Sequence, residues 1–135
     1  MTSNAIIKGL STIGRIGIAS LFALGALNKI LNFAATAESM DTANLPFVPV
    51  LLPLTILFEF AGAMALIFGR LSAAVASLAM AAYVLLVNVI FHPFWTMDGV
   101  MRDFELSLFF KNISIAGALI FLAASRLEKA GETSA

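Results

Sequence analysis

Four apolar stretches, each about twenty residues long, dominate this sequence and restrict what it can fold into. They run from about residue 13 to 33, 47 to 68, 71 to 91 and 106 to 125. A helix needs roughly 20 apolar residues to cross the hydrocarbon core of a bilayer, and each stretch has that length. Lipid offers the backbone no hydrogen bonds, so such spans form helices. The sequence therefore predicts an all-α integral membrane protein built as an antiparallel four-helix bundle.

The composition supports this class. Of the 135 residues, 61% are hydrophobic and 12% are charged, whereas soluble domains contain about 45–50% and about 25%. A chain of this length cannot bury so much apolar surface inside a water-facing core. We therefore expect a single transmembrane domain over residues 1–135 that is covered by the lipid bilayer, with residues 126–135 as a flexible tail.

The positive charges predict the orientation. Only Gly69 and Arg70 separate the second and third spans, so these spans should form a tight hairpin. Cationic residues near span ends favour the cytoplasm. The hairpin and both termini carry such residues and the opposite side is mostly acidic, so we expect the hairpin and both termini in the cytoplasm. The cations on the predicted cytoplasmic side are Lys8, Arg15, Arg70, Arg126 and Lys129.

The first span has a competing interpretation as a signal peptide. The apolar run 16–27 follows a basic residue and precedes the small residues Ala35-Thr36-Ala37, as a cleavage site would require. The polar pair Asn28 and Lys29 before that site is unusual for a signal peptide. A mature N-terminus at Glu38 would establish cleavage and leave three spans.

Charge balance and cysteine content exclude several kinds of site. Acidic and basic residues number eight each, so the chain has no basic excess for nucleic acid. Cysteine is absent, which excludes a thiol nucleophile, a disulfide and a cysteine-ligated iron–sulfur cluster. The single histidine brings no second imidazole or thiolate, so we expect no metal site.

Glu59 is the clearest candidate for a functional residue. It lies about twelve residues into the second span, roughly 18 Å along the helix axis and near the midplane. An ionisable group at that depth is costly and asks for a partner or a role. Lys29 and Lys111 both lie near the outer ends of their spans, and Arg15 lies at the other end of the first span. We expect Glu59 to pair with Lys29 or Lys111 before Arg15.

The end of the third span carries further polar residues. Asn88 and His92 are four residues apart and share a helix face. Pro93 stops the helix, and Trp95 is an expected interfacial anchor. His92 is either a hydrogen-bonded histidine of the interface or a residue that relays protons or contacts a ligand.

An antiparallel bundle would bring the outer halves of all four spans together. This predicts a polar pocket that opens outward, with Glu59 at its floor, although a structural network that fixes helix register is the alternative. The predicted ligand-binding residues are Asn28, Lys29, Glu59, Asn88, His92, Trp95, Lys111 and Asn112.

Four pieces of the sequence, in order, resemble the DoxX family of small bacterial membrane proteins. The pieces are Gly25-Ala-Leu-Asn28-Lys29, Glu59-x-x-Gly62 through Gly69, Phe91-His92-Pro93-Phe94-Trp95, and Phe110-Lys111-Asn112 followed by Ala116-Gly117. Two alanines, Ala63 and Ala118, stand where the family often has a second glycine. The resemblance implies a four-span protein of the bacterial inner membrane, and it marks Asn28, Lys29, Glu59, His92, Trp95, Lys111 and Asn112.

The resemblance also carries functional expectations. Members of the family include subunits linked to thiosulfate oxidation with quinone as acceptor, and proteins associated with oxidative-stress or thiol-homeostasis complexes. It therefore implies an accessory subunit with quinone as its ligand and a redox partner subunit that supplies electrons. The chain would not be an autonomous enzyme, and would at most be a subunit of a quinone-dependent oxidoreductase. A structural or assembly subunit without a ligand is one alternative. A small transporter or proton pathway is another, and a homo-oligomer would supply its missing size.

Overall fold

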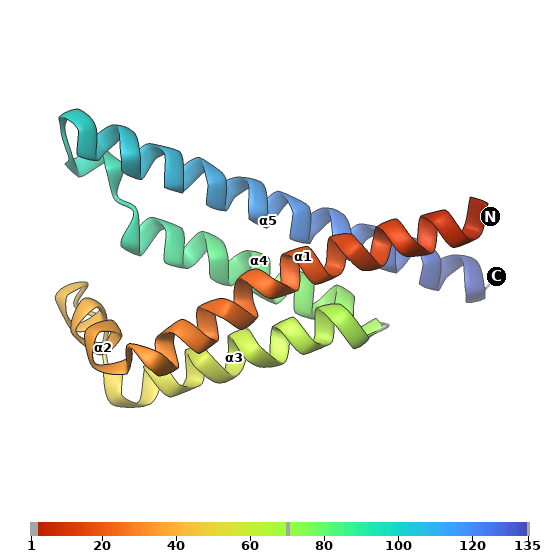
Figure 1. Cartoon of the computed structure of the whole chain (residues 1–135), viewed down its shortest axis with the longest axis horizontal. Coiled ribbons are helices and arrows are strands. Elements are labelled where there is room, and N and C mark those ends of the chain that lie inside the picture. Colours follow the sequence, from red (N-terminus) through yellow and green to blue (C-terminus); the bar gives the residue numbers. More distant parts are fainter. Residues whose placement is uncertain (1–2, 70, 135) are drawn as a thin grey trace. The chain divides into compact units, whose positions relative to one another are not determined.

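The computed structural model describes residues 3–69 and 71–134, and these are helical almost throughout (Figure 1). Across these two ranges no strand is present, and four helices are long and apolar enough to cross a membrane by length and composition. The predicted all-α membrane fold class is confirmed. The elements are α1 (Ser3–Leu31), α2 (Phe33–Thr42), α3 (Val48–Phe68), α4 (Leu71–Phe91), the 3-10 turn η1 (Phe94–Thr96) and α5 (Gly99–Ser134).

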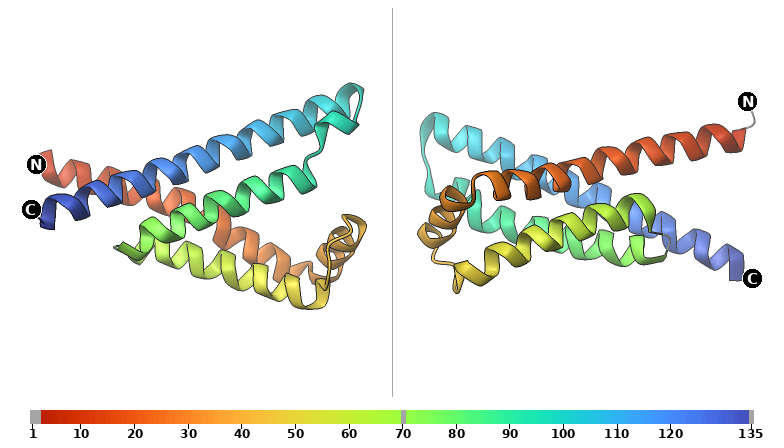
Figure 2. Two further views of the ribbon diagram at one scale, coloured as in Figure 1. Left: turned by 180° about the vertical axis from the view of Figure 1, so that it is seen from behind. Right: turned by 60° about the horizontal axis from the view of Figure 1, so that its bottom comes forward.

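The helices group into two compact units, and each is described by itself. The first unit is Met1–Ala73 and the second is Ala74–Ala135. In the first unit α1 packs against α3 with opposite chain direction, and α2 contacts both (Figures 1 and 2). In the second unit η1 joins α4 to α5, which runs back beside it. The expectation of a single transmembrane domain over residues 1–135 stays a prediction.

The helix bounds differ from the predicted spans mainly in α1 and α5. α3 and α4 coincide with the second and third spans to within one residue. α1 begins at Ser3 and not near residue 13, and α5 starts at Gly99 and not near residue 106. α5 also continues to Ser134, so most of the segment expected to be a flexible tail is helical. Arg70, expected in the tight hairpin, lies outside the described residues.

The polar segment between the first two spans contains α2, which the sequence analysis did not predict. Asn44 follows α2 in the left-handed conformation with φ of 55°. Its N–H donates to Asp41 O at 2.9 Å, and the N–H of Leu45 donates to Met40 O at 3.1 Å. This pair of bonds is the Schellman motif, in which asparagine is one of the few residues that accept a left-handed backbone. The chain then turns toward α3.

Proline and glycine set the connection between α4 and α5. Pro93 disfavours helical geometry at the residue before it, so α4 ends at Phe91. The turn η1 follows, closed by the Thr96 N–H on Pro93 O at 3.0 Å. Gly99 then has φ of +60°, a conformation that costs a glycine little. These two residues allow the chain to reverse in few residues and bring α5 back along α4.

Small side chains make up much of the contact between α1 and α3. The buried residues of α1 are Ala19, Phe22 and Ala26, and Gly62 and Ala63 are buried in α3. Helices in lipid gain little from apolar burial and associate through close packing and polar contacts. Large apolar side chains are instead widely exposed, as expected of surfaces that face lipid.

Candidate functional site

An ion pair joins α1 to α3 inside the first unit. The Nζ atom of Lys29 donates to both Glu59 carboxylate oxygens at 2.9 Å. The side chain of Glu59 is 6% exposed and that of Lys29 is 24% exposed. Lys29, one of the two lysines considered, is therefore a partner of Glu59. The predicted pairing of Glu59 with one of these lysines is confirmed.

The helical repeat places Glu59 in this contact. In α3 the buried residues Leu52, Glu59 and Leu66 are seven residues apart, so they share one stripe of the helix. In α1 the buried residues Phe22 and Ala26 lie seven and three residues before Lys29, on the same face. Because the two helices run in opposite directions, the last turn of α1 reaches the middle of α3. The two charges therefore meet inside the packed face.

Gly25 makes room for the carboxylate. A Cβ atom built on Gly25 would lie 3.2 Å from Oε2 of Glu59 and 3.8 Å from Nζ of Lys29. Gly25 precedes Lys29 by one helical turn, so the missing side chain opens the surface of α1 where the carboxylate approaches. In the sequence, Gly25 is marked only by its place in the stretch that resembles the DoxX family. Its spacing of four from Lys29 was the available signal for a role beside the ion pair.

Arg15 has a different role from the one considered for it. Its Nη1 atom donates to Ile67 O at 2.9 Å, and its Nε atom donates to Ser11 O at 3.3 Å. Ile67 lies in the last turn of α3, where carbonyl groups lack donors within the helix and the helix dipole is negative. Arg15 therefore caps the C-terminus of α3 and fastens it to α1.

Asn28 does not join the ion pair by any hydrogen bond of the described residues. Its Oδ1 atom accepts a hydrogen bond of 2.8 Å from Nδ2 of Asn32, one turn further along the chain. Asn28 is exposed, and its backbone carbonyl also accepts the Asn32 N–H at 2.9 Å. These bonds stabilise the junction between α1 and α2.

The second unit contains a buried amide pair. Asn88 of α4 is fully buried, and its Nδ2 atom donates to Phe109 O of α5 at 3.1 Å. Its Oδ1 atom accepts a hydrogen bond of 3.0 Å from Nδ2 of Asn112. The asparagine thus uses both ends of its amide to bind α5. The two predicted site residues Asn88 and Asn112 are in direct contact.

His92 is paired with an acid that was not among the predicted site residues. Its Nδ1 atom lies 2.7 Å from Oε2 of Glu105, and both side chains are largely buried. With Glu105 ionised, the carboxylate can only accept, so Nδ1 carries the hydrogen. Glu105 is thirteen residues away along the chain, beyond the reversal at Pro93 and Gly99. Only the helical start of α5 at Gly99 brings it back to His92, and the predicted start near residue 106 concealed this.

Trp95 and Lys111 complete the predicted set. Trp95 is half exposed and makes edge-to-face contacts with Phe94, at 5.3 Å between ring centroids, and with Phe109, at 6.0 Å. Lys111 is exposed, and within residues 3–69 and 71–134 it makes no hydrogen bond or ion pair.

The structure thus gathers the predicted residues into two groups. Lys29 and Glu59 belong to the first unit, and Asn88, His92, Trp95 and Asn112 belong to the second. The outward-opening pocket predicted from the sequence would combine residues of both units, and it stays a prediction. Within the described residues, no group of three or more histidine and acidic side chains is arranged to hold a metal ion.

Comparison with known proteins identifies relatives of this chain. A family model described as DoxX matches residues 10–93, from α1 through the end of α4. The inner membrane protein YqjF of Escherichia coli K12 is 34% identical over 82% of this chain and 79% of its own length. The inner membrane protein YphA of the same organism is 29% identical over 84% of this chain and 81% of its own length.

No solved structure matches the chain significantly. The family model covers more than half of the sequence, and it includes both partners of the Lys29–Glu59 ion pair. YqjF and YphA are inner membrane proteins, and this chain has four helices of the length and composition that a span needs. The chain is an inner membrane protein that belongs to the DoxX family.

Proposed function

We propose that this chain is an accessory subunit of a redox complex and that it binds a quinone at the Lys29–Glu59 ion pair. The observation that carries the proposal is the hydrogen-bond inventory of Lys29. An ammonium group has three N–H donors, and the two oxygens of Glu59 accept at 2.9 Å each. The side chain of Lys29 is 24% exposed, and within the described residues its ammonium makes no hydrogen bond besides those to Glu59, which leaves the third N–H for a ligand.

The chemistry of the pair suits a neutral ligand with a carbonyl group. Lysine and glutamate together carry no net charge, so an anionic head group would have to compete with Glu59 for the same ammonium. A quinone carbonyl can accept the third N–H and leave the ion pair intact. A hydrogen bond from a charged donor contributes about 1.5–3 kcal/mol. Quinones dissolve in the hydrocarbon of the bilayer, which is where this pair lies if α1 and α3 span the membrane.

The redox step requires a partner. Reduction of a quinone to the quinol takes two electrons and two protons and forms one O–H bond on each quinone oxygen. In this proposal a redox partner subunit supplies the electrons and water on one side of the membrane supplies the protons. Lys29 orients the quinone and stabilises negative charge that develops on its oxygen. The inner membrane localisation shared with YqjF and YphA is compatible with this role.

The test is a quinone titration of the full chain in lipid nanodiscs. Binding is measured as the quinone retained by nanodiscs that contain the chain, after subtraction of the quinone retained by empty nanodiscs. Addition of a short-chain ubiquinone should give a saturating binding curve. Lys29→Met should weaken binding by about tenfold or more, the equivalent of one charge-assisted hydrogen bond.

A matched control separates binding from general damage. Lys8→Met removes the same charge from an exposed position of the same helix and should leave the titration unchanged. Retention that grows linearly without saturation in the unmodified chain, or saturating curves that are identical in Lys29→Met and Lys8→Met, would contradict the proposal.

A structural or assembly subunit is the second candidate, and the buried amide pair favours it. Asn88 bonds to α5 through both its amide nitrogen and its amide oxygen, as a residue that fixes helix register would. In that case Lys29→Met would lower the stability of the chain and leave the turnover of correctly assembled complex intact. The predicted cytoplasmic location of both termini, the homo-oligomer and the proton pathway remain proposals without a contact that favours them.

A further inference from the structure

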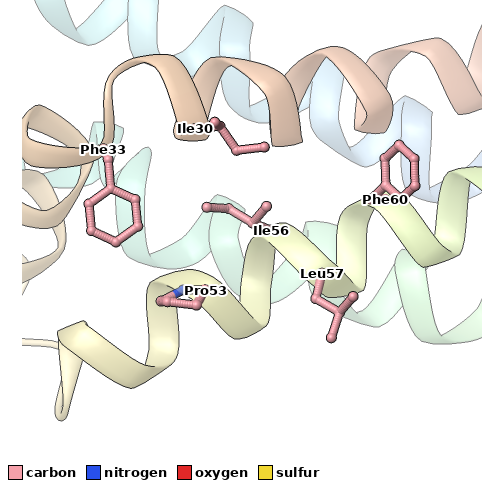
Figure 3. Close-up of a pocket in the computed structure, with 6 residues that line it drawn as sticks. All are labelled: Ile30, Phe33, Pro53, Ile56, Leu57 and Phe60. Atoms are coloured by element: carbon pink, nitrogen blue, oxygen red, sulfur yellow. The ribbon is translucent and has the colours of Figure 1, made fainter.

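An apolar groove lies beside the ion pair in the first unit. Figure 3 shows Ile30 and Phe33 on one side and residues of α3 on the other. Its volume is about 560 Å³, which is within the range of sites for small ligands. The groove follows α3 over about 10 Å, from the seven-residue separation of its first and last lining residues. The residues of α3 that line it are Pro53, Ile56, Leu57 and Phe60.

The groove runs along the edge of the face that carries the charges. Ile30 directly follows Lys29 in α1, and Phe60 directly follows Glu59 in α3. On a helix of 3.6 residues per turn, Ile56 and Phe60 lie roughly 60° and 100° around from Glu59. A chain that occupied the groove would therefore begin next to the ion pair and lie on the lipid-facing side of α3.

We infer that this groove holds the first part of the prenyl tail of a quinone whose head group binds Lys29, an inference that rests on the proposed function. A membrane contains acyl chains and prenyl chains, and the polar group attached to each chain determines which of them fits a groove beside Lys29. A phospholipid acyl chain is attached to ester carbonyls and a phosphate that stay at the bilayer surface, whereas Glu59 lies about twelve residues into its predicted span. The ammonium of Lys29 is also already engaged by both oxygens of Glu59 at 2.9 Å, which disfavours an anionic group. A prenyl chain brings a neutral carbonyl head, which needs only the third N–H of Lys29.

The groove determines where the quinone tail lies and adds little to the binding affinity. Hydrocarbon outside the protein is as apolar as the groove, so a chain that enters it gains close packing and no hydrophobic free energy. The appropriate measurement is therefore the location of the tail. The control must be a site at nearly the same depth in the membrane but on another side of the helix.

Two tryptophan reporters on α3 meet this requirement. In a Trp95→Phe background, Phe60→Trp places an indole in the groove. Phe58→Trp places one two residues earlier and roughly 160° around the helix, about 3 Å away in depth. Both replace phenylalanine by tryptophan, at positions that are 53% exposed for Phe60 and 37% exposed for Phe58. Thermal unfolding midpoints are compared before titration, and equal midpoints show that the two proteins fold equally well.

Each reporter is titrated in nanodiscs with a prenylated ubiquinone and with ubiquinone-0, which has the head group but no tail. We expect the prenylated quinone to cause a saturating loss of fluorescence in the Phe60→Trp reporter and a smaller, linear loss in the Phe58→Trp reporter. Ubiquinone-0 should not reproduce the difference between the reporters. Lys29→Met in the Phe60→Trp background should convert the saturating curve into a linear one.

Two other outcomes overturn the inference in distinguishable ways. If both quinones bind saturably to the unmodified chain but the prenylated quinone quenches the two reporters equally, the tail lies in bulk lipid and only the groove assignment fails. If neither quinone binds saturably to any of the proteins, the proposed function fails together with the groove. A groove occupied by a phospholipid chain falls under the first of these outcomes.

Discussion

At the scale of single residues, the ion pair depends on a position with no side chain. Gly25 lets the carboxylate of Glu59 approach the backbone of α1, since an added Cβ atom would lie 3.2 Å from Oε2. Most real contacts of a Cβ atom are wider than this, so one of the two groups would have to move. Gly14 and Gly17 on the same helix have no atom within 4 Å of the corresponding Cβ position. Glycines of one helix therefore have different roles.

Substitution of these glycines provides the first residue-scale prediction. Gly25→Ala should lower the free energy of unfolding by about 1–3 kcal/mol, the usual cost of overpacking a contact. Gly17→Ala should lower it by less or raise it, because alanine is the better helix former and nothing obstructs it. The measurement is reversible unfolding in mixed detergent micelles, followed by circular dichroism.

A second substitution decides whether the loss arises from the carboxylate. Glu59→Asp shortens the side chain by one methylene, so the Gly25→Ala/Glu59→Asp protein should lose less than the sum of the two single changes. Strict additivity would mean that Gly25 acts on the packing of α1 without reference to Glu59.

At the scale of elements, α1 and α3 are fastened at two levels. The Lys29–Glu59 pair lies in the outer part of their contact by the predicted orientation, and Arg15 binds Ile67 O at the other end. Helices in lipid lack a hydrophobic force that would hold them together, so such polar contacts carry much of the specificity. The two contacts are more than one helical turn apart along each helix, which fixes the register of α1 on α3.

The ion pair should show strong coupling between its members. Lys29→Met alone leaves a buried carboxylate without its cation and should cost about 3 kcal/mol of unfolding free energy. Lys29→Met/Glu59→Gln removes both charges and should recover most of that loss, because neither desolvated charge remains. Unfolding of the four proteins of this double-mutant cycle gives the coupling energy. A double mutant that is as unstable as the sum of the single mutants would show that the two side chains act independently.

Much of this element-level structure was predictable from the sequence, and the reasons for the exceptions are physical. Span length and hydropathy located α3 and α4 because lipid tolerates few other structures. The depth of Glu59 in its span favoured two lysines as its expected partners over Arg15. The sequence did not reveal α2, because its hydrophobicity pattern is weak and its end depends on a left-handed asparagine. It did not reveal the His92–Glu105 pair, because the start of α5 is polar and reads as a loop.

The apolar groove could not have been predicted. Ile30, Phe33 and the lining residues of α3 are ordinary lipid-facing residues in the sequence, and only the angle between the helices leaves space among them. For Lys111 the reverse holds, because a lysine inside a predicted span was expected to make a polar contact. Within the described ranges, the structure gives this lysine no hydrogen bond or ion pair.

At the scale of the whole molecule, four spans require that the two termini lie on the same side of the membrane. The distribution of cationic residues predicts that this side is the cytoplasm. The polar residues of the connection between α4 and α5, which include Asp98, then lie on the outer side. The absence of cysteine makes the orientation simple to measure, because every introduced thiol is unique.

We expect Asp98→Cys to react with a membrane-impermeant maleimide in intact cells. Glu132→Cys, near the end of α5, should react only after the membrane is opened. Both positions are exposed, so accessibility within the protein does not distinguish them. Labelling of Glu132→Cys alone in intact cells would reverse the predicted topology, and labelling of both would show that α5 does not cross the membrane.

The order of the ion pair along the chain has a consequence for biosynthesis. Translation proceeds from the N-terminus, so Lys29 reaches the bilayer with α1 before the ribosome has made Glu59. When α3 leaves the translocation machinery, its acidic residue meets a counter-charge that is already in place. An unrelated anchor of equal hydropathy in place of α1 would still insert. With such an anchor, the acidic group of α3 would enter the hydrocarbon without a counter-charge, which costs free energy. The first helix therefore acts as an insertion partner for the third.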